Sequence, residues 1–423
     1  MIHTETWKTE EKAILVGTGE KYAGAAEDQR ERYLDELALL TDTAGARVVG
    51  TIVQARATID PASYLGSGKV QELLELVEET HATSVIFDVD LTPAQVSNLQ
   101  KTLDRKIIDR SGLILDIFAL RAKTRAARTQ VELAQLKYLL PRLTRQWTHL
   151  SRQVGGIGTR GPGETQLEVD RRRVRERIDN LSRVLKTIGK QRSVARKQRA
   201  GRFKVSLIGY TNAGKSTMLN ALSGADVPVE NKLFKTLDSV TRMVQYPDMP
   251  VILVSDTVGF IRDLPHDLIV SFESTLDEVR DADLLLHVID ITNPEWQHQM
   301  DVVNGVLADM KVTDTDMLCV FNKVDGLDNP DIMEGLRKRF QRSVFVSAQT
   351  GEGVEELIQE LKRSATSGYV TITRSFGPDD GFLLSEIHRL GIIHETTPDG
   401  DSFEVTFSLP IPHAERLSIM PEH

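Results

Sequence analysis

Short apolar runs alternate with polar and glycine-containing segments between residues 200 and 365, and four of these runs predict buried strands. They are Phe203–Ile208, Val251–Ser255, Met317–Phe321 and Ser343–Val346. Continuous apolar runs of this length are typical of parallel strands that are covered on both faces. The segment Thr217–Leu222 follows the first run with a helical pattern, so we expect a parallel sheet with helices on both faces.

The first 120 residues show a second alternation of apolar runs with helical patterns. Ala13–Val16, Val48–Val53 and Ser84–Phe87 are strand-like, whereas Gln29–Leu40 and Val70–Glu79 are helix-like. Strands that alternate with helices predict βαβ units. We therefore expect a small α/β domain with a parallel sheet.

Residues 121–199 carry two apolar seams with steps of three, four or seven residues, a spacing typical of packed helices. The first seam comprises Leu133, Leu136, Leu140, Leu143, Trp147 and Leu150, and the second comprises Leu167, Val174, Ile178, Leu181, Leu185 and Ile188. Pro141 is expected to kink the first helix. One loop joins the seams, which predicts an antiparallel helical hairpin with this loop at its tip.

Residues 366–423 differ in character from the preceding segments. Tyr369–Thr373 and Ser402–Phe407 alternate like strands, Asp380–Leu390 has a helical pattern, and Pro398–Asp401 is typical of a turn. Two strands do not form a stable domain alone. We expect a small α+β domain that docks on a neighbour.

The net charge of −9 hides an uneven distribution. Between Arg121 and Lys204 there are 23 Lys or Arg residues against 6 Asp or Glu residues, a net +17, so the rest of the chain carries −26. A basic block in an acidic protein favours a polyanion such as RNA as partner, and a solvated charged helical face is the alternative. The size of the imbalance, the excess of arginine and the glycine-rich loop within the block favour RNA.

The composition, with 40% hydrophobic and 27% charged residues over 423 positions, predicts a globular protein of two or three domains. No apolar run approaches the ~20 residues of a membrane span. The N-terminus lacks the pattern of a signal peptide, and the single cysteine, Cys319, permits no disulfide framework. We expect a cytoplasmic monomer without stable membrane insertion.

The most specific motif lies between a predicted strand and a predicted helix and reads Gly209-Tyr210-Thr211-Asn212-Ala213-Gly214-Lys215-Ser216. A glycine-rich turn at this place points several backbone N–H groups at one spot, and the helix N-terminus adds partial positive charge. Lys215 would reach the β- and γ-phosphates of a nucleotide, and the Ser216 hydroxyl would ligate Mg²⁺. The strand–turn–helix context disfavours the alternative, an ordinary glycine turn.

Two later segments are candidates for sensing a γ-phosphate: Phe234-Lys235-Thr236-Leu237-Asp238 and Asp256-Thr257-Val258-Gly259. Thr236 would close over Mg²⁺ and the γ-phosphate, although a threonine in a loop is commonplace. Asp256 would hold the metal through a water, and the Gly259 N–H would contact the γ-phosphate. A strand that ends in a capping aspartate is the alternative for this second segment.

Two further segments are candidates for reading the base: Asn322-Lys323-Val324-Asp325 and Ser347-Ala348-Gln349. The Asp325 carboxylate could accept two N–H bonds from guanine, and adenine cannot offer that pair. Lys323 would lay its aliphatic stem over the base. The Ala348 N–H would meet the guanine O6. Lysine is more usual at position 349, but Gln349 can still stack on the base.

Taken together, these segments predict a GTPase domain of the Ras-like superfamily over residues 200–365. Lys215, Thr236 and Gly259 would be its catalytic residues, and Ser216, Thr236 and Asp256 its metal site. Phe260 follows Gly259, where many GTPases place a glutamine that orients the attacking water. A phenylalanine cannot do this, so we expect slow intrinsic hydrolysis that a partner stimulates.

The loop between the two helical seams reads Gly155-Gly156-Ile157-Gly158-Thr159-Arg160-Gly161-Pro162-Gly163-Glu164. Five glycines and a proline exclude a helix or strand, so this is either a flexible tip or a backbone able to approach RNA closely. Arg152 and Arg160 offer phosphate contacts. Further candidates for RNA contact are Arg171, Arg172, Arg173 and Arg175, which cannot all face the seam.

This loop, its continuation to Arg172 and the GTPase segments resemble the bacterial HflX family. Ser63–Lys69 and Asp109–Phe118 also fit, and the resemblance extends from about residue 10 to residue 365. It implies a GTPase that binds the large ribosomal subunit and its RNA, with the hairpin loop near the peptidyl-transferase centre, and that splits stalled ribosomes under stress. It also implies a K⁺ ion near the phosphates at Asn212, and an association with ATP. For ATP, Leu65–Lys69 is the candidate turn, against a structural turn or an RNA contact.

We therefore expect four domains in this chain: an N-terminal α/β domain (1–120), a basic helical hairpin (121–199), a GTPase domain (200–365) and a C-terminal α+β domain (366–423). GTP hydrolysis would time release from the ribosome. Two alternatives stay open: an assembly or RNA-binding scaffold that does not split ribosomes, and a protein-binding regulatory GTPase whose basic hairpin is only solvated.

Overall fold

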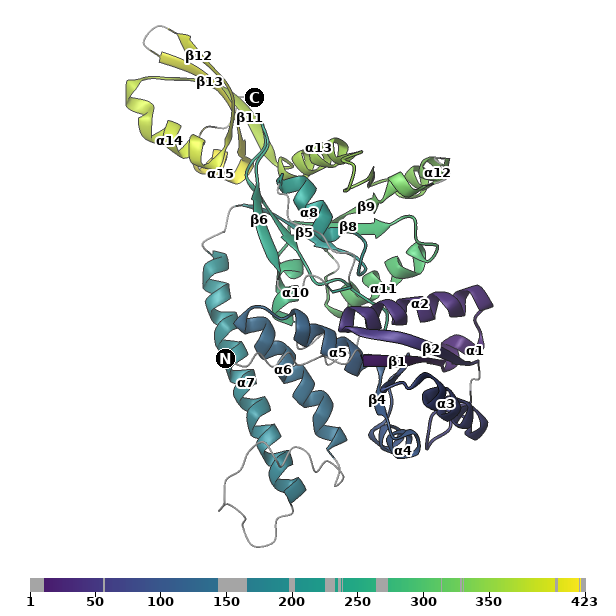
Figure 1. The fold of residues 1–423 in the computed structure, drawn as a ribbon. Coiled ribbons are helices and arrows are strands. Elements are labelled where there is room, and N and C mark those ends of the chain that lie inside the picture. Colours follow the sequence, from purple (N-terminus) through teal and green to yellow (C-terminus); the bar gives the residue numbers. More distant parts are fainter. Residues whose placement is uncertain are drawn as a thin grey trace, which may run out of the picture. The chain divides into compact units, whose positions relative to one another are not determined.

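The computed structural model of the chain describes residues 11–55, 58–143, 166–197, 202–224, 233–234, 237, 239–263, 273–312, 314–327, 329, 331–399, 402–417 and 419. By their contacts, the residues form two compact units. The first comprises Met1–Val194, Glu230–Asp238 and Asp263–Ser274, and the second comprises Ala195–Val229, Ser239–Arg262 and Thr275–His423. Figure 1 labels most of the helices and strands of both units.

The first unit contains a four-stranded sheet in the order β2-β1-β3-β4, and all its strand pairs are parallel. Its strands are β1 (Glu11–Thr18), β2 (Ala46–Gln54), β3 (Ser84–Phe87) and β4 (Lys106–Ile108). This confirms the predicted parallel sheet, and β4 is an additional strand.

Helices cover both faces of this sheet. They are α1 (Glu20–Ala23), α2 (Glu27–Ala44), α3 (Ser67–Thr80), α4 (Pro93–Leu103) and α5 (Arg110–Arg121). Helices α3 and α4 pack on Ile14 and Val16 of β1. Ala13 and Leu15, which alternate with those residues, are buried as well. Helices α2 and α5 contact each other and the sheet.

The hairpin helices of the first unit are α6 (Arg125–Leu139) and α7 (Gln166–Lys197). Glu132 of α6 pairs with Arg177 at 2.7 Å, and the Leu143 carbonyl accepts a bond from Arg171 at 2.8 Å. The order of these partners confirms that the helices are antiparallel. The predicted kink at Pro141 is wrong, because α6 ends at Leu139 and Pro141 lies in a 3-10 turn, η1 (Leu140–Arg142). Trp147, Leu150 and the tip loop lie outside the described residues.

The second unit contains a six-stranded sheet in the order β10-β9-β8-β5-β7-β6. Its strands are β5 (Phe203–Ile208), β6 (Val240–Val244), β7 (Ile252–Asp256), β8 (Leu284–Asp290), β9 (Asp316–Asn322) and β10 (Ser343–Val346). All neighbours are parallel except β6 and β7. The predicted parallel sheet and α/β class are therefore confirmed, and the antiparallel edge strand β6 is an addition that was not predicted.

Helices lie on both faces of this sheet as well. One face packs against α8 (Lys215–Ser223) and α13 (Val354–Ala365) through Leu219, Leu357 and other apolar residues. The other face packs against α11 (Trp296–Asp309) and α12 (Asp331–Arg339). A further helix, α10 (Glu273–Arg280), precedes β8.

The C-terminal part of the second unit forms an antiparallel sheet in the order β11-β13-β12. Its elements are β11 (Tyr369–Phe376), η4 (Pro378–Asp380), α14 (Gly381–Leu390), β12 (Ile392–Asp399), β13 (Ser402–Pro410) and α15 (Ile411–Arg416). The strand β12 was not predicted. A core of its own forms around Phe376, Phe407 and Ile387, so this sheet has three strands and a helical cover.

Candidate nucleotide-binding site

The predicted phosphate loop joins β5 to α8, and two of its glycines are required by close contacts. A Cβ on Gly209 would lie 2.2 Å from the Val288 carbonyl oxygen, and a Cβ on Gly214 would lie 2.2 Å from Asn322 Nδ2. Both glycines also have positive φ, at +146° and +97°. The loop is therefore closely fitted between the ends of β8 and β9.

Lys215 begins α8 and is buried against the loop that precedes it. Its ammonium donates to the carbonyl oxygens of Gly209 at 2.9 Å and Tyr210 at 2.7 Å. Burial lowers the pKa of Lys215 to about 8, and the nearby Asp256 carboxylate opposes this effect. At pH 7 the lysine therefore keeps its charge, and a bound phosphate would stabilise that charge further.

The residues expected to hold a metal come together at the carboxyl end of β7. The Ser216 hydroxyl donates to Asp256 Oδ2 at 2.6 Å, and Asp256 is buried. A hydroxyl and a carboxylate fit a hard cation such as Mg²⁺, which takes its remaining ligands from nucleotide and water. Across the parts of the chain that the structure describes, no three His, Cys, Asp or Glu residues gather as a metal site. Thr236, the third expected ligand, lies outside those parts.

The chain after β7 continues alongside the phosphate loop. The Thr211 N–H donates to the Phe260 carbonyl oxygen at 2.7 Å, and the Phe260 N–H donates to the Gly209 carbonyl oxygen at 3.1 Å. The Arg262 N–H donates to Tyr210 Oη at 3.0 Å. Gly259 lies close to the Lys215 ammonium between these bonds. The Phe260 ring is buried. Phe260 offers no group that could orient a water.

Asn322 connects the base-reading segments to the phosphate loop. Its Nδ2 donates to the Ala213 carbonyl oxygen at 2.8 Å, and its Oδ1 accepts from the Ala348 N–H at 3.0 Å. Asp325 and Gln349 follow these two segments in sequence, and their side chains are exposed. The carboxyl ends of parallel strands are where open α/β sheets bind ligands, and all these segments follow such ends.

Two residues near the site were not assigned a role from the sequence. Asp290, at the end of β8, pairs with Lys323 Nζ at 2.5 Å, and its only sequence signal is its place after an apolar run. His287, on the same strand, is buried. Burial and the Lys215 charge lower the pKa of His287 to about 4, so this histidine is neutral at pH 7.

The other predicted residues lie in several places. The Phe234 ring packs against Phe118. Thr257 is buried and its hydroxyl donates to the Leu207 carbonyl oxygen at 2.6 Å. Lys235, Asp238, Arg152 and the glycines of the hairpin loop with Arg160 lie outside the described residues. On α7, the side chains of Arg172, Arg173 and Arg175 are exposed.

The glycine-lysine turn considered for ATP is part of a helix start. Ser67 is the first residue of α3, and the Gly66 N–H donates to Gln54 Oε1 at 2.9 Å. Lys69 Nζ pairs with Glu72 at 2.8 Å, one turn further along the helix. This geometry gives no phosphate cradle of its own, and ATP binding at this domain stays a prediction.

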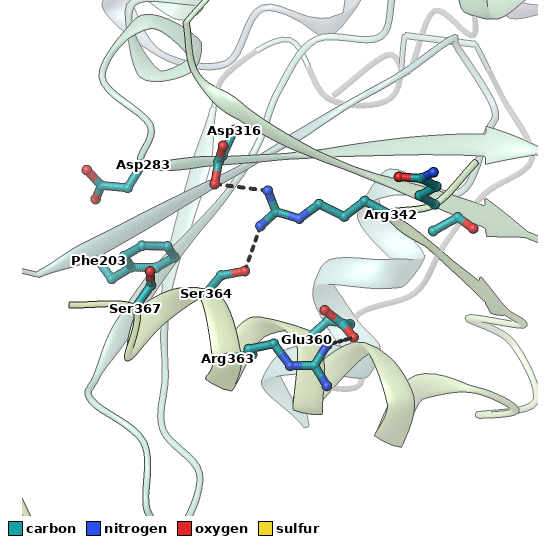
Figure 2. A pocket seen from close by; sticks show the side chains of 10 residues that line it. Phe203, Asp283, Asp316, Arg342, Glu360, Arg363, Ser364 and Ser367 are labelled. Carbon is teal, nitrogen blue, oxygen red and sulfur yellow. Dashed lines mark hydrogen bonds and ion pairs between the residues drawn. The ribbon is translucent and has the colours of Figure 1, made fainter. Parts of the chain in front are cut away.

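A hollow of about 580 Å³ lies on the second unit at the amino ends of its strands. Figure 2 shows Arg342 reaching toward Asp316 and Ser364, with contacts of 2.9 and 3.0 Å, and Arg363 paired with Glu360 at 2.6 Å. Because the phosphate and base segments follow the carboxyl ends of the strands, this hollow is separate from the candidate nucleotide site.

The strand order and the segments at its carboxyl edge are those of a P-loop GTPase domain, and the chain is a GTP-hydrolysing enzyme. Family models match residues 31–119 as a GTP-binding GTPase N-terminal region, 121–199 as a GTP-binding GTPase middle region and 204–323 as a 50S ribosome-binding GTPase. The chain belongs to the HflX GTPase family.

Relatives that are similar over most of their length show this family membership. GTPase HflX of Magnetococcus marinus is 46% identical over 402 residues, covering 94% of this chain and 92% of the relative. GTPase HflX of Escherichia coli is 42% identical, covering 96% and 95%. A solved GTP-binding protein from the archaeon Sulfolobus solfataricus, in complex with GDP, is 23% identical with a TM-score of 0.44, covering 84% of this chain and 99% of that one.

Proposed function

We propose that this GTPase binds the large ribosomal subunit through its N-terminal domain and basic hairpin, and that it splits or rescues stalled ribosomes under stress. GTP hydrolysis times its release. The observation that carries the proposal is the row of exposed arginines Arg172, Arg173 and Arg175 on α7. These side chains lie in a chain whose GTPase region matches a family described as 50S ribosome-binding.

Five arginines near the start of α7 differ in their contacts. Arg177 is paired with Glu132, and Arg171 donates to a main-chain carbonyl, so both support the hairpin. The side chains of Arg172, Arg173 and Arg175 are exposed, and an exposed guanidinium can contact phosphates. Arg172 also lies 4.0 Å from Glu176, one turn further along the helix, in a solvent-exposed pair that a phosphate could replace. We assign RNA contact to these three and to the tip-loop residues Arg152 and Arg160.

In the proposed reaction the phosphate loop and Lys215 bind the β- and γ-phosphates. Ser216 and Thr236 would hold Mg²⁺ directly, and Asp256 would hold it through a water. GTPases generally use this ion to neutralise the charge that develops on the phosphates. The Gly259 N–H contacts the γ-phosphate, and Asp325 reads guanine. A K⁺ ion at Asn212 is a further part of the proposal, and unequal rates in KCl and NaCl would support it.

A partner supplies the polar group that Phe260 lacks. Because the Phe260 ring is buried and apolar, hydrolysis by the protein alone is expected to be slow. An RNA or protein group of the ribosome would then complete the site, as an added catalytic group does in other GTPases. The wait for that group makes hydrolysis a timer.

The test is GTP hydrolysis by the purified protein with and without isolated large subunits. We expect stimulation of at least about tenfold, since an added catalytic group in GTPases gives larger effects still. Small subunits serve as the control for RNA in general. No stimulation with intact GDP binding would contradict the ribosome proposal. Incubation with whole ribosomes then separates splitting, which yields free subunits, from a scaffold role, which does not.

A further inference from the structure

The strands β8 and β9 are neighbours in the larger sheet of the second unit, and two residues at their carboxyl ends form an ion pair (Figure 1). Asp290 is the last residue of β8, and Lys323 directly follows β9. Asp290 lies opposite Asn322 in the register, and the Ile291 N–H donates to the Asn322 carbonyl oxygen at 3.1 Å. This pairing places the Asp290 carboxylate beside the start of the predicted base-reading segment.

The ion pair holds the end of the Lys323 side chain. Lys323 Nζ lies 2.5 Å from Asp290 Oδ2, and the two side chains are 35% and 14% exposed. A free lysine side chain samples many rotamers, and fixing them costs conformational entropy. Because its ammonium is paired, Lys323 has lost part of that freedom before any base binds.

The Asp290 carboxylate is itself held by the turn that follows β8. Its Oδ1 accepts from the Thr292 N–H at 3.1 Å and from the Thr292 hydroxyl at 2.6 Å. One carboxylate oxygen is thus bound within the turn, and the other pairs with Lys323. The carboxylate is therefore an acceptor whose direction is fixed.

The same turn contacts the base-reading segment at a second point. A Cβ on Gly326 would lie 2.9 Å from Thr292 Cγ2, so the glycine allows Thr292 to approach this segment closely. Lys323 lies two residues before Asp325, and Gly326 lies directly after it. The turn therefore supports the predicted guanine-reading carboxylate from both sides in sequence.

The backbone of Lys323 adopts a conformation that is unfavourable for lysine. Its φ is +67°, in the left-handed region that favours glycine. Such a conformation persists only where the surrounding structure fixes it. The Lys323 carbonyl oxygen accepts from the Gly326 N–H at 3.0 Å, and Asp290 holds the far end of the side chain. Both ends of the residue are thus constrained.

We propose that Asp290 is a positioning residue for guanine binding, which holds the Lys323 ammonium so that the aliphatic stem forms a fixed platform for the base. The stem presents apolar surface to the ring while the ammonium stays with the carboxylate. Asp290 acts through Lys323 and does not itself touch the nucleotide. GDP and GTP carry the same base, so the platform contributes equally to the binding of both. The proposal rests on the predicted role of Lys323 at the base.

The experiment measures the affinities of full-length Asp290→Asn for GDP and for a non-hydrolysable GTP analogue, both with Mg²⁺, and its single-turnover hydrolysis of GTP. We expect both affinities to fall by the same factor of about five, because part of the cost of ordering one lysine side chain then falls on binding. Hydrolysis at saturating GTP should stay within about twofold, since the platform binds ground state and transition state alike. Unchanged affinities, or a loss in hydrolysis of the same size, would overturn the proposal.

Lys323→Met tests the same contact from the other side. Methionine keeps an unbranched apolar side chain and has no ammonium for Asp290 to hold. We expect both affinities to fall about as far as in Asp290→Asn. The double variant should lose no more than either single variant, because the two changes remove one contact. Additive losses would mean that Asp290 acts without Lys323, which contradicts the proposal.

Asp316→Asn is the matched control. Asp316 is the first residue of β9 and pairs with Arg342 at 2.9 Å, so this change breaks an ion pair of the same unit at the amino end of the strand. Both nucleotide affinities should be unchanged. An equal loss in this variant would show that breaking any ion pair of the sheet weakens binding, and the specific role of Asp290 would be refuted.

The possible failures give different results. If Lys323→Met loses affinity and Asp290→Asn does not, the positioning role of Asp290 is wrong. If both variants bind as the wild type does, the role of Lys323 at the base is wrong as well. Thermal unfolding shows whether Asp290→Asn folds, and Lys323→Met still tests the pair if it does not. No ribosomes are present, so the ribosome proposal is tested separately.

Discussion

At the scale of single residues, the nucleotide site depends on a few side chains that each join two segments. Asn322 is the main one, since it holds the phosphate loop with its nitrogen and the Ala348 segment with its oxygen. Gly214 must lack a side chain to leave room for that amide. The position of Asp325, three residues after Asn322, is thereby tied to the position of the predicted phosphate loop.

Asp325→Asn should change which base the site accepts. The carboxylate would accept two guanine N–H groups, whereas an asparagine amide places an N–H group against one of them. A lost bond to a charged group and an unpaired donor cost about 3 kcal/mol together, so GTP affinity should fall about 10²-fold. Xanthosine triphosphate, which carries an oxygen in place of the amino group, should bind better to the variant than to the wild type.

The measurement is equilibrium binding of GTP, xanthosine triphosphate and ATP to both proteins. Asp331→Asn, at the exposed start of α12, makes the same chemical change away from the base and should leave all three affinities unaltered. If Asp325→Asn binds GTP as tightly as the wild type does, Asp325 is not the residue that reads guanine.

At the scale of elements, hydrogen bonds join the phosphate loop to the chain that follows β7. Two main-chain bonds and the bond from Arg262 to Tyr210 Oη extend the parallel pairing of β5 and β7 past the ends of both strands. Arg262 is also the last residue of the second unit before the chain passes to the first. Tyr210 therefore anchors the point from which the following segment departs.

Tyr210→Phe should loosen this anchor while the ring stays in place. The buried Arg262 N–H would lose its acceptor, which costs about 1–3 kcal/mol. We expect faster amide exchange at residues 259–262 and a loss of about tenfold in single-turnover GTP hydrolysis, because the Gly259 N–H is held less firmly. GDP affinity should change little.

Tyr246→Phe is the control for this prediction. It removes another tyrosine hydroxyl of the same unit, one that donates to the Leu222 carbonyl oxygen at 2.6 Å, away from the phosphate loop. Exchange at residues 259–262 should not respond to it. Equal exchange in Tyr210→Phe and wild type would show that the two main-chain bonds suffice to hold the segment.

The elements that the sequence predicts are those with strong local patterns. The apolar runs of β5, β7, β9 and β10 predicted four of the six strands of the second unit's larger sheet. The three-residue β4, the edge strand β6 and the polar β12 were missed because they have little or no apolar alternation. The strand β8 was missed as well, although Leu284–Ile289 is a continuous run with a strong apolar signal. Only Val244 of β6 is buried, and its pairing with β7 is what identifies it as a strand.

The same limit applies within the site. Short motifs predicted the phosphate loop and the base segments, because each is a local run of characteristic residues that directly follows an apolar strand. It did not predict the contacts that hold them: Arg262 lies 52 residues from Tyr210, and Lys323 lies 33 residues from Asp290. The contact between the rings of Phe234 and Phe118 was not predicted either, because the sequence around an aromatic residue in a loop does not indicate which residue it will contact.

At the scale of the whole molecule, the dominant feature is the separation of charge along the chain. The segment between Arg121 and Lys204, which includes the helical hairpin, has a net charge of +17, whereas the whole chain has a net charge of −9. Clustering so many like charges on two helices opposes folding unless a polyanion is the partner. Among the residues that the structure describes, no helix is long and apolar enough to cross a membrane.

Replacing Arg172, Arg173 and Arg175 together by glutamine should weaken binding to the large subunit in a salt-dependent way. If each arginine contacts one phosphate, the slope of log affinity against log salt should become shallower by about 0.7–0.9 for each, or about 2–3 in all. The difference between variant and wild type should therefore be largest at low salt. GTP hydrolysis without ribosomes should be unchanged, because these residues belong to the first unit, whereas the phosphate loop belongs to the second.

The control removes the same amount of charge from another part of the surface. Lys338, Arg363 and Arg389 are exposed residues of the second unit, and each is paired with a nearby glutamate. If binding depends only on net charge, the slope of log affinity against log salt should become shallower by the same amount in both triple variants. If the hairpin contacts RNA phosphates, only the α7 variant should show this change, since release of counterions depends on the cations that replace them at the phosphates. Equal slopes in the α7 variant and the wild type would leave the α7 arginines as a solvated face of the helix.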